Sequence, residues 1–523
     1  MKYGAWISVI AATLVSTLAM SVNLAAQDEQ ADHQMHHTYK LVDLGTLGGP
    51  NSYNESIPPE IIINLGGIAA AYADTSAPDP YYPNCFTFNL EDCVVNHAFV
   101  WQGGVVTDLG SLPGGYSSYA SSINARGEIV GYSQNGQIDP LTLYPEGMAV
   151  LWKNGIINLG TLGGNQSVAN AINDRGQVVG GALNAILDQF ANSPLSCNGC
   201  GAFAQTFLFV PAATETHAFL WRDGEIQDLG TLGGPDSTAA VVNDRGQIAG
   251  QSFINFIANP SGVPTIDPFF WENGKMVDIG TLGGTFGFPA WLNNRGQVVG
   301  VSNLAGDQAH HAFLWDKKQG LKDLGTLKGY SSASYANWIN DAGEIVGESD
   351  SQTASRAFLW RNGIMTNLGT VAGDTCSVAN SINSQGQIVG FGTADCFNED
   401  HAFLSENGGA MIDLQSLVPP GSALTLIDAI FINDRGEIAA RAKLSNGNEH
   451  AVVLFPCDEH HPLVFDCNYN LVDVSSLAAA KTVQVTSMIA NPSKLSPAEM
   501  MTRFRSLGAG RNRRYGTPQT SAK

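Results

Sequence analysis

The sequence predicts an all-β protein, a β-propeller of about eight four-stranded blades, on three observations. A link close to DLGTLGG, a turn of the form Ile-Asn-x-x-Gly and a segment close to His-Ala-Phe-Leu-Trp recur in one fixed order along the chain. Successive links begin between 44 residues apart (Asp323 to Asn367) and 70 residues apart (Asn158 to Asp228). Repeats of this period are typical of solenoids, propellers and helical arrays.

Eight copies of the three motifs follow one another. The links begin at Asp43, Asp108, Asn158, Asp228, Asp278, Asp323, Asn367 and, in a degenerate form, Asp413. The turn asparagines are Asn64, Asn124, Asn173, Asn243, Asn293, Asn340, Asn383 and Asn433. The third motif ends at Trp101, Trp152, Trp221, Trp271, Trp315, Trp360, Ser405 and Leu454. Eight blades follow from this count, and seven with one degenerate unit is the other number that the pattern allows.

Each copy reads as four strands joined by two tight turns and one variable loop. In the second copy the expected strands are residues 121–124, 128–132, 148–152 and 156–159. Asn124 suits the opening of the first turn and Gly127 its end, where φ is positive. Asn154-Gly155, the strongest kind of short-range hairpin signal, joins the last two strands. No segment between the repeats has a helical pattern.

Four antiparallel strands are what one propeller blade requires. The His-Ala-Phe-Leu-Trp segments are largely apolar on both faces, as strands buried between neighbouring blades should be. We expect residues 469–474 to form the fourth strand of the eighth copy. Residues 39–44 are then a surplus strand that pairs with the last blade and seals the ring. A β-solenoid is the alternative fold, although its repeats are usually shorter.

The two ends of the chain differ from the repeats in composition. A charged start, an apolar run and small residues near residue 26 are typical of a secretory signal peptide. We expect a signal peptide at 1–26, a flexible segment at 27–38, the propeller at 39–475 and a basic tail with a short helix at 476–523. The mature protein is therefore expected to be secreted, extracellular or periplasmic, and to have no membrane span.

Charge is divided unevenly along the chain. The formal net charge is −21, and residues 480–523 hold eight Lys or Arg and one Glu, which gives +7. The rest therefore carries −28, which is −21 minus +7. An acidic body disfavours nucleic acid and anionic membrane as partners. We expect a monomer with an unknown extracellular ligand, either a carbohydrate or a protein.

Eight cysteines in an exported chain favour disulfides. They fall in neighbouring couples, and we expect local pairing within them: Cys85 and Cys93, Cys197 and Cys200, Cys376 and Cys396, Cys457 and Cys467. Cys197 and Cys200 have the spacing of a redox motif, but no βαβ pattern surrounds them. A structural disulfide is the better interpretation of that pair.

The three motifs together resemble the HAF family of extracellular bacterial repeats. The resemblance rests on His-Ala-Phe, DLGTLGG and Ile-Asn-x-x-Gly and covers residues 39–474. It implies secretion from a bacterium. It implies no activity and no catalytic residues, so none are transferred to this chain.

Function is expected where the copies differ, because a residue that recurs in every blade is repeated around the ring and cannot build one asymmetric site. The recurrent histidines should instead hydrogen-bond a neighbouring strand or link: His97, His217, His311, His401 and His450. The most divergent segments are the loops 74–96 and 183–216, both after a second strand. Loops on one face of a rigid scaffold are the usual place for binding. We predict Tyr81, Tyr82 and Phe86 as ligand-binding residues, since tyrosine and phenylalanine offer flat apolar area.

No motif for catalysis or for a cofactor is present. The sequence contains no G-x-S-x-G, no G-x-x-x-x-G-K and no HExxH. Two histidine clusters are present. Residues 32–37 are interpreted as a flexible end, and residues 458–461 as a polar loop between Cys457 and Cys467. We expect no metal site at either cluster. We favour a binding protein. A polymer-degrading hydrolase or lyase with its site at the same loop face is the alternative, so enzymatic activity stays open.

Overall fold

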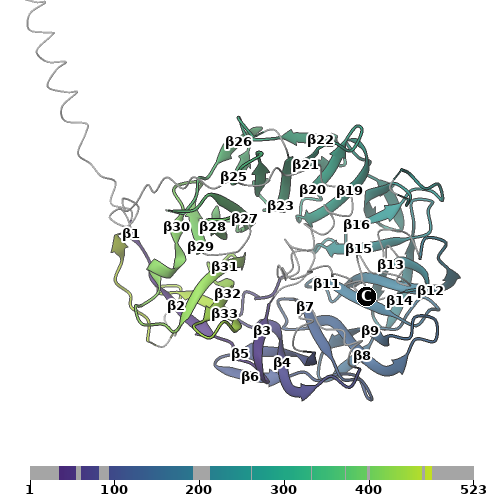
Figure 1. Cartoon of the computed structure of the whole chain (residues 1–523), viewed down its shortest axis with the longest axis horizontal. Coiled ribbons are helices and arrows are strands. Elements are labelled where there is room, and N and C mark those ends of the chain that lie inside the picture. The colour runs from purple at the N-terminus through teal and green to yellow at the C-terminus, as the bar shows by residue number, and fades with distance from the viewer. Residues whose placement is uncertain are drawn as a thin grey trace, which may run out of the picture.

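Eight four-stranded antiparallel units form one closed ring in the computed structural model (Figure 1). The structure describes residues 35–54, 61–81, 93–191, 212–260, 262–330, 333–371, 373–396, 401–461, 464 and 466–473. The fold is a β-propeller with eight blades, which confirms the predicted class. A seven-bladed ring and an open solenoid are both excluded by the closure of blade 8 on blade 1.

The strands follow one another as blade after blade. Blades 1 to 4 consist of β3 (Gly48–Tyr53), β4 (Ala69–Pro78), β5 (Val94–Gln102), β6 (Val105–Asp108), β7 (Ser118–Ile123), β8 (Ile129–Ile138), β9 (Pro145–Trp152), β10 (Ile156–Asn158), β11 (Ser167–Ile172), β12 (Val178–Leu187), β13 (Thr214–Arg222), β14 (Glu225–Gly230), β15 (Ser237–Val242), β16 (Ile248–Phe253), β17 (Ile266–Glu272) and β18 (Lys275–Asp278). Blades 5 to 8 consist of β19 (Gly283–Leu292), β20 (Val298–Leu304), β21 (His310–Asp316), β22 (Gly320–Gly325), β23 (Ala333–Ile339), β24 (Ile345–Asp350), β25 (Ser355–Arg361), β26 (Ile364–Asn367), β27 (Cys376–Ile382), β28 (Gln387–Thr393), β29 (His401–Glu406), β30 (Ile412–Asp413), β31 (Leu424–Ile432), β32 (Ile438–Leu444), β33 (Glu449–Pro456) and β2 (Tyr39–Asp43). The one helix among the described residues is the short 3₁₀ helix η1 (Leu414–Leu417).

Local turn chemistry produces these units. In the hairpin between β9 and β10, Asn154 has φ 54° and Gly155 has φ 120°. Positive φ at both central residues is the type I′ geometry, which matches the twist of the flanking strands. The glycine of each Ile-Asn-x-x-Gly turn also has positive φ, from 69° at Gly67 to 86° at Gly343. Both turn predictions are confirmed.

The ring is closed by the N-terminal strand. β2 pairs antiparallel with β33, with Leu41 opposite Leu454, and so supplies the fourth strand of blade 8. The expectation that residues 469–474 form that strand is wrong. Val472–Asp473 is the short strand β34, and it pairs instead with β1 (Met35–His36) outside the ring. Only the outer edge of β33 is available for a fourth strand of blade 8. β2, which precedes the first blade in the sequence, occupies that edge.

The core lies between the blades. The phenylalanine of the His-Ala-Phe motif is 0% exposed in five blades: Phe99, Phe219, Phe313, Phe358 and Phe403. In one cluster Val130 and Leu151 of blade 2 pack with Phe219 of blade 3. Burial of one such side chain stabilises by about 1.5–3 kcal/mol. Because each sheet is covered on both faces, the strands do not alternate between apolar and polar residues.

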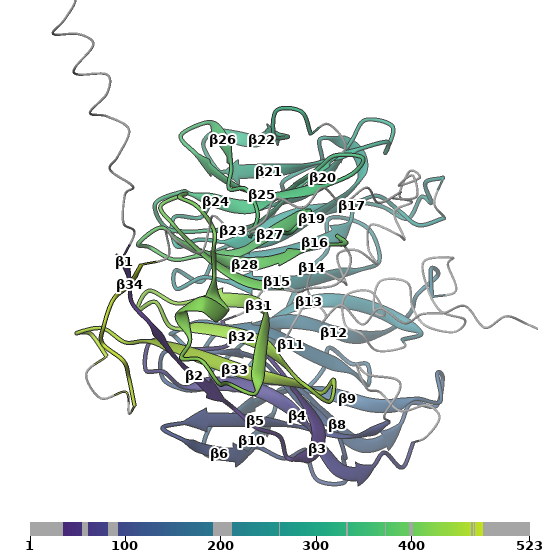
Figure 2. The ribbon, with the colours of Figure 1, turned by 60° about the vertical axis from the view of Figure 1, so that its left-hand side comes forward.

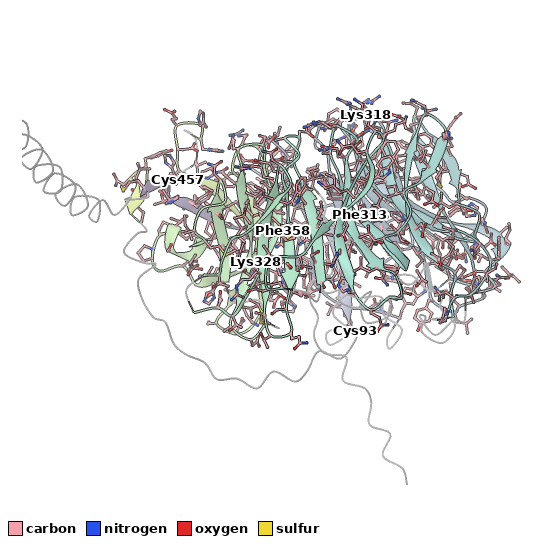
Figure 3. All side chains as sticks on the ribbon, turned by 90° about the horizontal axis from the view of Figure 1, so that it is seen from above. Cys93, Phe313, Lys318, Lys328, Phe358 and Cys457 are labelled. Atoms are coloured by element: carbon pink, nitrogen blue, oxygen red, sulfur yellow. A yellow bond between two sulfur atoms is a disulfide. The ribbon has the colours of Figure 1, made fainter. Side chains whose placement is uncertain are left out.

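The two faces of the ring carry different connections between strands. The turn face carries the Ile-Asn-x-x-Gly turns and the hairpins between third and fourth strands. The opposite face carries the links and the connections between second and third strands. Figure 3 shows the ring edge-on, with Lys318 of a third-to-fourth hairpin on one face and Cys93, beside β5, on the other; Phe313 and Phe358 lie between them.

Two of the expected disulfides lie within the described residues. They are Cys376–Cys396, with Cα atoms 5.1 Å apart, and Cys457–Cys467, with Cα atoms 5.4 Å apart. Cys93 is also disulfide-bonded, while Cys85, Cys197 and Cys200 lie outside the described residues. Within the part of the chain that the structure describes, no helix is long and apolar enough to cross a membrane.

The expected signal peptide and basic tail lie outside the described residues. The expected flexible segment reached residue 38, but residues 35–38 are held in place. Met35 and His36 form β1, and the Thr38 carbonyl oxygen accepts a hydrogen bond of 2.8 Å from the Cys457 amide. Residues 35–38 are therefore held by contacts with residues 457–473.

Candidate functional site

The recurrent asparagines form a closed hydrogen-bonded ring on the turn face. Each side-chain Nδ2 donates to the main-chain oxygen of the turn asparagine in the next blade, at 2.8–3.1 Å, in the order Asn64, Asn124, Asn173, Asn243, Asn293, Asn340, Asn383, Asn433 and back to Asn64. The Oδ1 atom accepts from two amides of its own turn, as Asn124 does from Arg126 and Glu128. These side chains are fully used by the fold, so they are not candidates for ligand binding.

The recurrent histidines pair with the aspartates that begin the links. His97 Nδ1 lies 2.9 Å from Asp108 Oδ2, and the same contact joins His450 of blade 8 to Asp43. His217 pairs with Asp228 and His311 with Asp323 in the same way. His401 of blade 7 differs, since it contacts Asp374, inside the link that precedes its blade. The prediction that these histidines bond a neighbouring strand or link is confirmed.

Blade 4 replaces this pair with two carboxyl groups. Asp267 occupies the histidine position and hydrogen-bonds Asp278, which begins the link. Burial and the neighbouring Asp278 raise the pKa of Asp267 to about 7. Asp267 therefore stays partly protonated up to neutral pH, and its proton is shared with Asp278.

The blades differ most at the connections between second and third strands. In blades 1, 2 and 3 the second strand is ten residues long, whereas it is six or seven in blades 4 to 8. The extra pairs are Pro78 with Val94, Ile138 with Pro145, and Leu187 with Thr214. We call these three hairpin extensions the arms, and their side of the ring the arm face. In Figure 2, β9 and β12 run out to the right-hand side.

The sequence predicted two of these arms, on blades 1 and 3, and missed the arm on blade 2. Its signal is present in the sequence, since residues 135–146 separate the strand partners Gln134 and Gly147. In blade 6 only residues 351–354 separate the matching partners, Asp350 and Ser355. The three arms therefore stand on consecutive blades.

A fourth repeated motif shapes the arms. Asp79, Asp139 and Asp188 each end the extended hairpin and accept a hydrogen bond of 2.7–2.8 Å from the amide two residues ahead, at Tyr81, Leu141 and Phe190. This is an Asx turn. Burial raises the pKa of Asp79 and Asp188, that of Asp188 to about 6 with help from the charge of Glu215. Sequence reasoning did not identify these aspartates.

Large apolar side chains are exposed at the ends of these segments. They are Ile138, Leu141 and Leu143 in the second arm, Ile186 and Leu187 in the third, and Phe256 and Ile257 in the matching loop of blade 4. Ile257 is 74% exposed and Leu143 is 69% exposed. The Gln189 Nε2 atom donates to the Phe256 carbonyl oxygen at 3.4 Å, which joins the third arm to the loop of blade 4.

Of the three predicted ligand-binding residues, the structure describes one. Tyr81 in the first arm packs edge-on against Tyr116 of the following link, with ring centroids 5.6 Å apart. Burial, Tyr116 and Asp79 raise the pKa of the Tyr81 hydroxyl. Tyr116 is itself exposed and was not predicted. Tyr82 and Phe86 lie outside the described residues.

The two histidine clusters of the sequence meet on the turn face. His36 and His37 line one pocket together with Asp458 and His460, between blades 7 and 8. Among the residues that the structure describes, no three His, Cys, Asp or Glu side chains are arranged to hold a metal ion.

Comparison with known proteins gives no family. No family model matches the chain, and no curated protein matches it. Solved structures that resemble it include the β-propeller domain of the Trilobed protease from Pyrococcus furiosus, with 9% identity, a TM-score of 0.39, and coverage of 73% of this chain and 97% of that one.

Two further structures give similar values. The Dos1 propeller has 10% identity, a TM-score of 0.36, and coverage of 80% of this chain and 95% of that one. A polysaccharide lyase of family PL25, an ulvan lyase, has 11% identity, a TM-score of 0.34, and coverage of 80% and 96%. Likeness at this level carries no information about function.

Proposed function

We propose that the protein is an exported binding protein that holds its ligand on the arm face of blades 1 to 4. The observation that carries the proposal is the group of exposed apolar side chains on the second and third arms and on the loop of blade 4. Monomeric proteins rarely expose large contiguous apolar surface unless it contacts a partner. The rigid ring fixes the spacing of the arms and so reduces the ordering cost of binding.

Backbone strain in the second arm supports this proposal. Leu143 has φ 63°, in the left-handed region, which is costly for a residue with a branched side chain. Its amide donates to the Asp139 carbonyl oxygen at 2.8 Å, so the turn holds the strained residue in place. Strain concentrates at functional sites, where it fixes a side chain for use. Here it presents an apolar side chain to solvent.

Export is part of the proposal. Disulfides form and persist in oxidising compartments. Cys376–Cys396 and Cys457–Cys467 agree with the sequence signal for secretion and with the resemblance to extracellular bacterial repeats. The ligand class that suits exposed leucine, isoleucine and aromatic side chains is a partner surface or a polymer with apolar faces.

Polymer cleavage at the same face is a second candidate. It is favoured by Asp188, a buried carboxyl group with a pKa of about 6 that lies near Glu215 and Asp236. A carboxyl group whose pKa is raised toward neutral pH is suited to act as a general acid. Asp188→Asn distinguishes the two functions, because it would abolish cleavage of a polysaccharide while leaving its retention on the arm face.

The proposal is tested by removing the arms one at a time. Residues 135–146 are replaced by Ser-Gln-Thr-Ala, the sequence of residues 351–354 that closes the same hairpin in blade 6. The first and third arms are shortened in the same way. Retention on a panel of polysaccharides and on bacterial cell envelopes should fall at least tenfold.

The matched control shortens the loop of blade 5, residues 304–309, to the same four residues. This loop lies on the same face but outside blades 1 to 4, and its change should leave retention unaltered. Thermal unfolding confirms that each variant is folded. Equal retention by all the folded arm variants would disprove the proposed site.

A further inference from the structure

On the turn face of blades 2, 4, 6 and 7, the residue that follows the His-Ala-Phe-Leu-Trp segment contacts the residue that follows the turn glycine. Lys153 Nζ lies 2.6 Å from Glu128 Oε1, and Arg361 Nε lies 2.6 Å from Glu344 Oε1. In blades 4 and 7 the residue after the third strand is a glutamate, and the residue after the turn glycine is a glutamine. Gln247 Nε2 donates to Glu272 at 2.6 Å and Gln387 Nε2 donates to Glu406 at 3.1 Å.

Glu272 and Glu406 therefore occupy the same place in two blades, but only Glu272 pairs with a lysine. The second oxygen of Glu272 accepts from Lys317 Nζ of the next blade, at 2.9 Å. The His450-to-Leu454 segment corresponds to His311-to-Trp315, so the equivalent of Lys317 in blade 8 is Pro456. Among the described residues, no lysine or arginine pairs with Glu406.

A pocket lies where the missing lysine side chain would be. Its volume is about 470 Å³, and both Glu406 and Pro456 line it. Met35, Leu404 and Tyr39 add apolar surface to the wall. The disulfide Cys457–Cys467 and the pairing of β1 with β34 hold the segments that contribute Met35, His36 and Asp458 to the wall.

The polar part of the wall is acidic. Three carboxylates line the pocket, those of Glu406, Asp434 and Asp458, together with three histidines, His36, His37 and His460. The guanidinium of Arg435 is turned to the Leu65 carbonyl oxygen at 3.1 Å and to Glu437. Burial and the charges of Glu406 and Asp458 raise the pKa of the Tyr39 hydroxyl, which stays protonated. The negative body of the protein adds to this potential.

The carboxylate of Glu406 can accept a further hydrogen bond. Its side chain is 39% exposed, and beyond Gln387 its described polar neighbour is His36 Nδ1, at 3.4 Å from Oε2. The His36 ring is 8% exposed, and its Nε2 has no hydrogen-bond partner among the described residues. Burying a polar atom without a hydrogen-bond partner costs free energy. This cost favours a ligand with a polar group beside His36.

We propose that this pocket binds a primary ammonium group on an alkyl chain, in the position that Lys317 Nζ takes beside Glu272. The ammonium would donate to Glu406, and the methylene groups would pack on Met35, Leu404 and Pro456. An ammonium has three donors and pairs well with carboxylates. The source is either a free diamine or a lysine side chain of a partner. The site is on the turn face and is independent of the function proposed for the arms.

Calorimetry of the full chain tests the proposal with matched probes. The cationic probes are 1,5-diaminopentane and a capped Gly-Lys-Gly peptide, and the neutral probe is pentane-1,5-diol, of the same length. We expect the diamine to bind and the diol not to bind. Binding of both diamine and peptide indicates a lysine-recognition site, and binding of the diamine alone indicates a free amine.

Variants then place the binding at Glu406. Glu406→Gln should weaken diamine binding at least tenfold, and Glu272→Gln, the matched control in blade 4, should leave it unchanged. Pro456→Lys supplies a tethered ammonium, so it should abolish diamine binding and raise the Tm. This variant decides the question if Glu406→Gln does not fold.

Three results would overturn the proposal. They are equal binding of diol and diamine, unaltered diamine binding in a folded Glu406→Gln or Pro456→Lys variant, and binding of Zn²⁺ without binding of either cationic probe. The last result would make the pocket a metal site.

Discussion

The side-chain Nδ2 of Asn433 donates to the main-chain oxygen of Asn64 at 3.1 Å, across 369 residues of sequence. This contact joins the last blade to the first and completes the ring of eight turn asparagines. The second hydrogen of the same amide goes to Glu437 Oε2 at 2.7 Å, and Oδ1 accepts from the Arg435 and Glu437 amides. One buried side chain thus stabilises both its own turn and the closure.

We predict that Asn433→Ala destabilises the protein by about 2–3 kcal/mol, because it leaves a buried carbonyl, a carboxylate and two amides without their partner. Asn433→Asp should be worse, since it brings a negative charge beside Glu437. Urea unfolding measures the change. A loss below about 0.5 kcal/mol in the alanine variant would show that the asparagine ring adds little to stability.

The strand that closes the ring can be identified by proline substitution. Val42 lies opposite Val453, and its amide faces β33 as the Leu44 amide does, which donates to the Ala451 oxygen. Val42→Pro in β2 therefore removes a ladder hydrogen bond within blade 8 and should cost about 3 kcal/mol or more. Val472→Pro makes the same change in β34, which pairs with β1 outside the ring, and should cost less than 1 kcal/mol. Calorimetric unfolding compares the two. A larger effect at Val472 would contradict the closure by β2.

The carboxyl pair of blade 4 should make stability fall as the pH rises. The pKa of Asp267 is about 7 in the folded state and near 3.9 in an unfolded chain, so the folded state binds more protons between these values. The stabilisation is complete below pH 4 and is lost as the pH passes 7.

Asp267→Asn keeps a hydrogen-bond donor to Asp278 without needing the proton. It should be more stable than the parent at pH 8, by the order of 2 kcal/mol, and similar to it at pH 5. Asp267→His recreates the pair found in four other blades and should also stabilise at pH 8. Denaturant midpoints at the two pH values provide the measurement, and parallel curves for parent and asparagine variant would refute the shared proton.

Relief of strain at Leu143 should separate stability from binding. Leu143→Asn suits the left-handed conformation and removes an exposed apolar group, so we expect about 1 kcal/mol of added stability. If the arm face holds the ligand, the same variant should bind more weakly. Leu141→Asn, two residues earlier and also exposed, is the matched control, because it changes the surface without relieving strain. Thermal unfolding and ligand retention are measured on both.

The candidate site was only partly predictable from the sequence. Loop length identified the arms of blades 1 and 3, because an insertion is visible in any alignment of copies. The arm of blade 2 was missed, since its extension lengthens two strands that resemble their shorter counterparts. Tyr116 was missed because it belongs to a link, and only packing places it beside Tyr81.

The sequence by itself determined the repeated unit and its two turns, and it limited the number of blades to eight or seven. Those features depend on hydrogen bonds and φ angles within a few residues, such as Asn124 with Gly127, so each copy specifies them independently. The tertiary structure alone decided what happens between distant segments. It placed β2 instead of β34 in blade 8, joined His36 to Glu406, and set the pKa of Asp267 through burial beside Asp278. Such contacts depend on which surfaces meet when the ring closes, and no local pattern encodes that meeting.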